Sequence, residues 1–170
     1  MMKRKTVVGA AFLFIFAICC CSSALAQTPG GDKDIGILVA KIIMGFSLSL
    51  GLAGSAIGLG IAFSALLGGG EENFFKNIAV ALMPSTQGIY SIVVLFANMG
   101  GFEVDPYSVA GKSAAFGFTM LFSGWYQGVV CAAGIRSILE GRNTLANAMV
   151  SGAMPETYAV FALVMTFIMK

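Results

Sequence analysis

The sequence predicts an all-α membrane protein with four transmembrane helices, arranged as two tandem antiparallel hairpins that form a parallel internal repeat. Composition is the first observation: 58% of the 170 residues are hydrophobic and 11% are charged, whereas soluble domains carry roughly 25% charged residues. A net charge of +2 and the lack of histidine exclude a basic nucleic-acid-binding surface and the commonest general base.

Four long apolar segments are the second observation, and they run from about residues 35–67, 77–99, 109–139 and 145–169. Each exceeds the ~20 residues that cross a hydrocarbon core, and none alternates with the period of a barrel strand. Short connections make consecutive segments antiparallel. We therefore expect a first hairpin at 35–99, an outer connecting loop at 100–108 and a second hairpin at 109–170.

Residues 1–26 have the pattern of a cleaved signal peptide. Basic residues at 3–5 precede an apolar stretch, and residues 24–26 form a small-residue cleavage site. Cleavage leaves the polar segment 27–34 as the new N-terminus and places it outside the cytoplasm. The alternatives are an uncleaved extra helix and lipoprotein processing, although the residues before Cys19 make a poor lipobox.

The charged loop residues agree with this orientation. Lys76, Arg136 and Arg142 lie in or beside the loops expected to face the cytoplasm, and the outer loop carries Glu103 and Asp105. Basic residues favour the cytoplasmic side of a membrane. We expect a multi-pass protein of a bacterial cytoplasmic membrane.

The internal repeat is the third observation. Residues 83–90 match residues 154–161 at an offset of 71, and Gly60-Ile61 matches Gly134-Ile135 at an offset of 74. An even number of spans separates equivalent points, so both hairpins point the same way. Duplication of one hairpin gives this arrangement, which differs from the inverted repeats of many carriers.

Glu156 is the most informative residue because it lies inside an apolar segment. An ionised carboxylate at the bilayer midplane costs at least about 2.5–3.5 kcal/mol, so it must be neutralised, paired or bound to a cation. The first hairpin has Ser85 at the equivalent position, so one carboxyl serves four helices. The simpler alternative is a structural hydrogen bond to a neighbouring helix.

Small residues occur at helical spacing in the first span, with Gly54 four residues before Gly58 and Ala56 four residues before Gly60. Such pairs let helix backbones approach closely. Two interpretations stay open: packing within one chain, and the narrow inner wall of a ring.

Four residues share one face of the second span at spacings i, i+3, i+4 and i+7: Met83, Thr86, Gln87 and Tyr90. Together with Gln127 and Glu156, the side chains of Thr86 and Gln87 offer several hard oxygens, which suit alkali and alkaline-earth cations. One carboxylate favours a monovalent ion, and Tyr90 could donate a hydrogen bond to it. Pro84 removes the usual amide partner of the Val80 carbonyl and distorts the helix. The alternative is that these polar groups only join helices.

These motifs resemble the proteolipid ring (c/K-type) subunit of V-type rotary ATPases over roughly residues 35–169. The most specific segments are Pro155-Glu156-Thr157, the stretch from Pro84 to Tyr90, and Trp125-Tyr126-Gln127-Gly128. The resemblance implies that Glu156 carries the ion and that Tyr90 locks it. It also implies a ligand set for Na⁺: Glu156, Gln127, Thr86, Gln87 and the Met83 carbonyl. Ser85 and Tyr158 depart from the family, where glycine and glutamine are common, and the oxygen set favours Na⁺ over H⁺.

The resemblance further implies a membrane ring of copies that turns against a stator subunit and contacts the central stalk, with lipid around it. The sequence lacks the G-x-x-x-x-G-K-[ST] phosphate loop, so we expect no catalysis by this chain alone, no resident cofactor and no nucleic-acid partner. The alternatives are a small secondary carrier that uses Glu156 as a monomer or dimer, and a purely structural membrane protein.

Overall fold

The computed structural model describes residues 33–169, and the signal peptide predicted at residues 1–26 lies outside them. The described chain is helical, and its elements follow in the order α2 (Lys33–Leu67), α3 (Glu71–Leu82), η1 (Met83–Ser85), α4 (Thr86–Asn98), η2 (Met99–Gly101), α5 (Pro106–Leu139) and α6 (Leu145–Ile168). Within this part of the chain, four helical segments are long and apolar enough to cross a membrane: α2, the run from Glu71 to Gly101, α5 and α6. The predicted fold class is confirmed.

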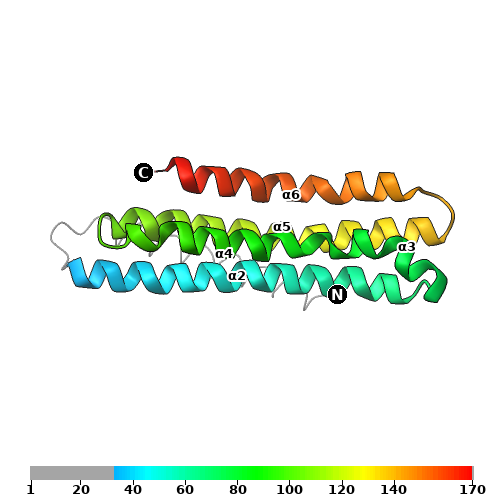
Figure 1. The fold of residues 1–170 in the computed structure, drawn as a ribbon, viewed down its shortest axis with the longest axis horizontal. Helices are drawn as coiled ribbons and strands as arrows, with labels where there is room; N and C mark the ends of the chain where they lie inside the picture. Colours follow the sequence, from blue (N-terminus) through cyan, green and yellow to red (C-terminus); the bar gives the residue numbers. More distant parts are fainter. Residues whose placement is uncertain (1–32, 170) are drawn as a thin grey trace, which may run out of the picture.

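The spans lie lengthwise beside one another, as Figure 1 shows. The turn between α2 and α3 and the turn between α5 and α6 lie at the same end, so the two hairpins point the same way (Figure 1). Gly70 and Gly141 stand in these turns with φ of 76° and 68°, a left-handed conformation that glycine adopts without steric cost. Both hairpins therefore reverse direction at a glycine.

The second hairpin begins with a clear helix start. Asp105 precedes α5, its carboxylate accepts a hydrogen bond from the Ser108 backbone amide at 3.1 Å, and Pro106 opens the helix. Proline suits this position because its missing N–H would have no helical partner. At the start of α6, the Thr144 hydroxyl accepts from the Asn147 amide at 3.4 Å.

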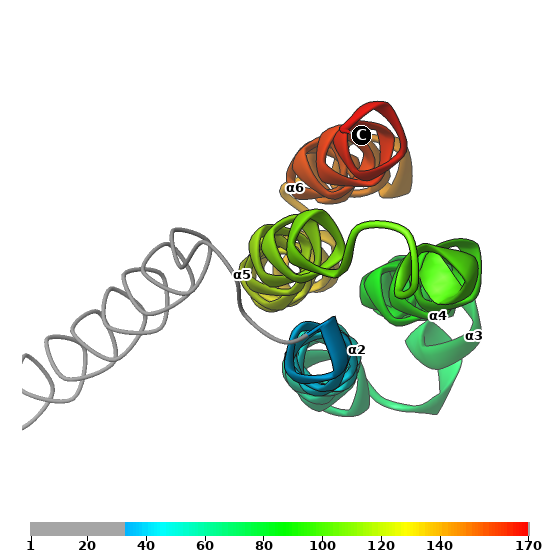
Figure 2. The same cartoon turned by 90° about the vertical axis from the view of Figure 1, so that its left-hand side faces the viewer.

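Helix α5 is the centre of the bundle and contacts α2, α4 and α6. Figure 2 shows the bundle end-on, with α5 between α2 and α6 and with α4 alongside. Glycines bring α2 and α5 together: a Cβ added at Gly124 would lie 2.7 Å from the Gly54 carbonyl carbon, and one at Gly128 would lie 2.3 Å from the Gly58 Cα. Gly54 and Gly58 thus pack within one chain, which was one of the two interpretations.

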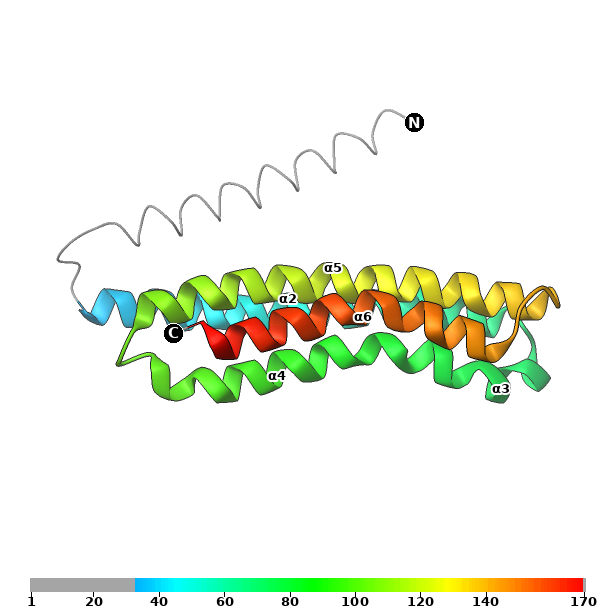
Figure 3. The ribbon, with the colours of Figure 1, turned by 90° about the horizontal axis from the view of Figure 1, so that it is seen from above.

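The two prolines of the repeat act differently. At Pro84 the helix tightens into the turn η1, and the Met83 amide donates to the Val80 carbonyl that proline leaves without its usual partner. Figure 3 shows that α3 continues into α4 with a kink between them. Pro155 instead lies inside the continuous helix α6. The predicted distortion therefore occurs at Pro84, and it gives the first hairpin a bend just before Gln87.

The contact between α2 and α5 predicts the effect of Gly128→Ala. Because the added methyl meets the Gly58 backbone, we expect it to destabilise the protein by about 1–3 kcal/mol, the usual cost of overpacking. Gly111→Ala on the same helix is the control, since its Cβ meets nothing within 4 Å. Unfolding of the purified protein in detergent, followed by circular dichroism, measures the difference. Equal midpoints for the two variants would contradict the close approach.

Candidate ion-binding site

Glu156 lies half-buried on α6, where it faces both α4 and α5. The Tyr90 hydroxyl on α4 donates to its Oε1 at 2.9 Å, and Gln127 Nε2 on α5 donates to its Oε2 at 3.4 Å. Each carboxylate oxygen thus accepts a hydrogen bond from a neutral donor on a different helix. The structure brings Tyr90, Gln127 and Glu156 together as the sequence pattern predicted.

Two buried amides continue this network away from the carboxylate. Gln87 and Gln127 are both 0% exposed, and Gln87 Nε2 donates to Gln127 Oε1 at 2.6 Å. Gln127 Nε2 also donates to the Gly152 carbonyl at 3.1 Å. A continuous chain of amide hydrogen bonds therefore connects α4, α5 and α6.

Ser123 belongs to the network, although the sequence analysis did not select it. Its Oγ accepts from Gln87 Nε2 at 3.2 Å and donates to the Pro155 carbonyl at 2.7 Å. Ser123 lies four residues before Gln127 on α5, so both side chains share one helix face. The i, i+4 spacing was the signal that could have identified it.

The Gln87 Oε1 atom is buried and has no hydrogen-bond partner among the described residues. The neighbouring groups explain its orientation. The single hydroxyl hydrogen of Ser123 goes to Pro155, so Ser123 can only accept from Gln87, and Gln127 also presents an oxygen. Both neighbours therefore accept hydrogen bonds from the amide nitrogen of Gln87, and its oxygen points away from them. A buried polar atom without a partner costs about 1–3 kcal/mol, which a bound cation would recover.

Thr86, directly before Gln87, and Met83, one turn before it, bond to each other. The Thr86 hydroxyl donates to the Met83 carbonyl at 3.3 Å, and among the described residues no hydrogen bond joins either of them to Glu156. The Met83 side chain does reach α6, because a Cβ added at Gly152 would lie 3.0 Å from its sulfur. The part of Thr86 and Met83 in ion binding stays a prediction.

Glu156 also borders an open hollow of about 330 Å³ on the outer side of α6, lined by Ala153, Thr157, Val160 and Phe161. Glu156 is therefore partly open to the surface that faces away from the bundle. Among the described residues no group of three or more His, Cys, Asp or Glu could hold a metal ion. Any cation here would be bound by one carboxylate and neutral oxygens.

A half-buried carboxylate held by neutral donors between two membrane hairpins is the arrangement expected of a membrane protein that carries ions. Comparison with known proteins agrees. A family model that describes the C subunit of ATP synthase matches residues 42–97 and 110–169, one segment in each hairpin.

Two curated relatives have similar sequences. The V-type sodium ATPase subunit K of Enterococcus hirae is 33% identical over 142 residues, which cover 79% of this chain and 91% of the relative. The A-type ATP synthase subunit K of Methanocaldococcus jannaschii is 33% identical over 166 residues, which cover 85% of this chain and 74% of the relative.

The chain belongs to the family of the ATP synthase C subunit. It is therefore a rotor-ring subunit of a rotary ATPase, which assembles with copies of itself and moves ions across the membrane. The family resemblance predicted from the motifs is confirmed.

The hydrogen bond from Tyr90 predicts the effect of Tyr90→Phe. Without it the carboxyl can turn toward the open hollow, so we expect a hydrophobic carbodiimide to label Glu156 about two- to tenfold faster. That range corresponds to one hydrogen bond of about 0.5–1.5 kcal/mol. Initial labelling rates read by mass spectrometry measure it. Tyr126→Phe, which changes a 63% exposed tyrosine on α5, is the control. If both variants react at the rate of the unmodified protein, Tyr90 does not restrain Glu156.

Proposed function

We propose that this rotor-ring protein transports Na⁺ and that Glu156 binds it between the two hairpins. The observation that carries the proposal is the buried Gln87 Oε1, which has no partner among the described residues and belongs to the network around Glu156. A hard oxygen suits Na⁺, whereas a proton on Glu156 would leave this atom without a partner. The name of the Enterococcus hirae relative, a sodium ATPase subunit, supports the same ion.

The other proposed ligands keep oxygen lone pairs for the ion. Gln127 Oε1 accepts one hydrogen bond and the Met83 carbonyl accepts the Thr86 hydroxyl, while a carbonyl oxygen has two lone pairs and a hydroxyl can still offer its own. Glu156 supplies the one negative charge, and Tyr90 holds its orientation. Pro84 and Pro155 support the site by setting the backbone beside Gln87 and Glu156.

Ion binding neutralises Glu156, and the neutral complex can face lipid because the cost of an exposed charge is removed. Rotation then carries it to a stator subunit, which exchanges the ion. Other subunits hydrolyse or make ATP, and this chain is not catalytic alone. The turn with Arg142 and the beginning of α3, with Glu72 and Lys76, would meet the central stalk. We place the ring in a bacterial cytoplasmic membrane. The family match favours this function over a small secondary carrier.

Sodium protection of Glu156 tests the proposal. The ring is treated with a hydrophobic carbodiimide at fixed, mildly acidic pH with increasing NaCl or KCl, and labelling is read by mass spectrometry. The reagent attacks a protonated carboxyl, so we expect Na⁺ to slow labelling at Glu156 and K⁺ to slow it much less. Glu156→Gln is the control and should not be labelled at this position. Fast labelling that ignores sodium would show that the ring carries H⁺.

Ser123→Ala tests whether the amide network prepares the site. The Gln87 nitrogen loses one acceptor, so its amide is free to rotate and the ligand oxygen is no longer fixed. We expect the sodium concentration that half-protects Glu156 to rise about two- to tenfold, as for one hydrogen bond of about 0.5–1.5 kcal/mol. Thr119→Ala is the matched control, because its hydroxyl bonds to the Ala115 carbonyl of its own helix. Equal sodium dependence for both variants would exclude a role for Ser123.

A further inference from the structure

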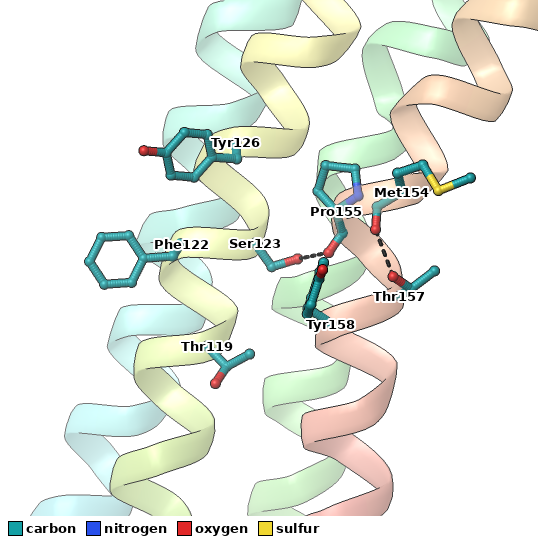
Figure 4. A pocket seen from close by; sticks show the side chains of 8 residues that line it. All are labelled: Thr119, Phe122, Ser123, Tyr126, Met154, Pro155, Thr157 and Tyr158. Carbon is teal, nitrogen blue, oxygen red and sulfur yellow. Dashed lines mark hydrogen bonds between the residues drawn. The ribbon is translucent and has the colours of Figure 1, made fainter.

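An open groove lies between α5 and α6, and Ser123 of the amide network lies on its wall. It has a volume of about 460 Å³, and Phe122, Tyr126, Met154 and Tyr158 line it together with Pro155. Figure 4 shows Tyr158 on α6 beside the hydrogen bond from Ser123 to Pro155. Tyr158 is 67% exposed in the single chain, so a large aromatic side chain has no cover here.

The internal repeat indicates what covers it. With the offset of 71, Pro155 corresponds to Pro84 and Tyr158 to Gln87. The corresponding place in the first hairpin lies between α2 and α4, and α5 fills it. There Gln87 meets Ser123 of α5, and a Cβ added at Gly58 would touch both Pro84 and the Gly124 carbonyl. The groove at Tyr158 is therefore equivalent to the space between α2 and α4, but no third helix of the described chain fills it.

The helix that corresponds to α5 is α2, with an offset of 74. This offset pairs Ser49 with Ser123 and Ala53 with Gln127. The same face of α2 is small and open along its length. Ser49 is exposed, Ala53 is partly exposed, and a Cβ added at Gly45 or Gly60 would meet nothing within 4 Å. The α2 of the same chain packs against α5 through its other face, so an α2 that fills the groove has to come from a second copy.

We propose that α2 of a second copy lies in the groove between α5 and α6, with Tyr158 against Ser49 and Ala53 of that copy. The sizes of the side chains agree with this register. Within one chain two glutamines meet, Gln87 and Gln127. Between copies the larger Tyr158 meets the smaller Ala53. The Ser49 hydroxyl donates to the Gly45 carbonyl at 2.9 Å and keeps lone pairs that can accept from the Tyr158 phenol.

The contact between copies then repeats the contact within a chain but lacks the acid, the two amides and the Tyr90 phenol of the ion site. Thr157, Met154 and Ser49 remain as the counterparts of Thr86, Met83 and Ser123. Four pairs of equivalent residues differ, and they are Gln87 and Tyr158, Gln127 and Ala53, Glu156 and Ser85, and Tyr90 and Phe161. The acid, both amides and the phenol are absent from the contact between copies. Ions are bound inside each chain, and the junction between chains is closed by an aromatic side chain.

This contact joins two different faces, the groove of one copy and α2 of the next. Such head-to-tail contacts generate a closed ring when the rotation between copies allows it. The inference depends on ring assembly and is independent of which ion Glu156 carries.

Cysteine cross-linking in the full-length, assembled ring tests the register. In a background where all four native cysteines are replaced by alanine, Tyr158→Cys is combined with Ala53→Cys, and mild oxidation should give a ladder of covalently linked copies. Tyr158→Cys with Ile42→Cys is the control. Ile42 is 62% exposed and, being eleven residues before Ala53, lies about 16 Å further along the helix. Its Cα is then too far for a disulfide, which needs about 7 Å or less.

An intact ring that forms no ladder with Ala53→Cys, or that forms one with Ile42→Cys, overturns the register. A size exchange covers the case in which the cysteine pair does not assemble. Ala53→Phe should abolish the ring by collision with Tyr158, and adding Tyr158→Ala should restore it, as seen by native mass spectrometry. Lack of restoration also overturns the proposal. Sodium protection of Glu156, measured on the same rings, separates failure of this contact from failure of the sodium assignment.

Discussion

The cost of a carboxylate in a membrane constrains this structure more than any other interaction. Among the described residues the ion pairs, Glu72 with Lys76 and Glu140 with Arg142, lie at the hairpin turns, and Glu156 has none. Neutral donors hold it instead. A permanent basic partner would compete with any transported cation, whereas a phenol and an amide leave the charge to be balanced by the ion. Neutral partners would therefore allow the cation proposed for this site to bind reversibly.

Close packing of the backbones holds these donors in place. The glycines of α2 and α5 bring the two helices into backbone contact, and α5 then carries Ser123 and Gln127 between α4 and α6. Pro84 packs against the same contact and interrupts the helix just before Gln87. The polar network thus depends on small residues and a proline that do not themselves bind an ion.

The sequence predicted the four spans, the parallel repeat and the residues around Glu156, because apolar length and helical spacing are local properties. It did not identify Ser123. A serine in a membrane helix often bonds back to its own helix, as Ser91 does to the Gln87 carbonyl, and the sequence does not say which serine reaches across. The unpaired Gln87 Oε1 was also beyond prediction, since it depends on how three neighbouring hydrogen bonds orient one amide.

The cost of a charge in the membrane also accounts for the difference between the two hairpins at the position of the acid, which is Ser85 in the first and Glu156 in the second. An acid at position 85 would lie at the contact between copies, where the phenol of Tyr90 and the amides of Gln87 and Gln127 are replaced by Phe161, Tyr158 and Ala53. The two donors of Glu156, Tyr90 and Gln127, correspond there to Phe161 and Ala53, which donate no hydrogen bond. The acid would therefore bear more of the cost of a charge in hydrocarbon. The serine at position 85 and the aromatic side chain of Tyr158 both agree with the contact between copies proposed above. The first hairpin has a serine in place of the acid and supplies the Tyr90 phenol that donates to the acid of the second.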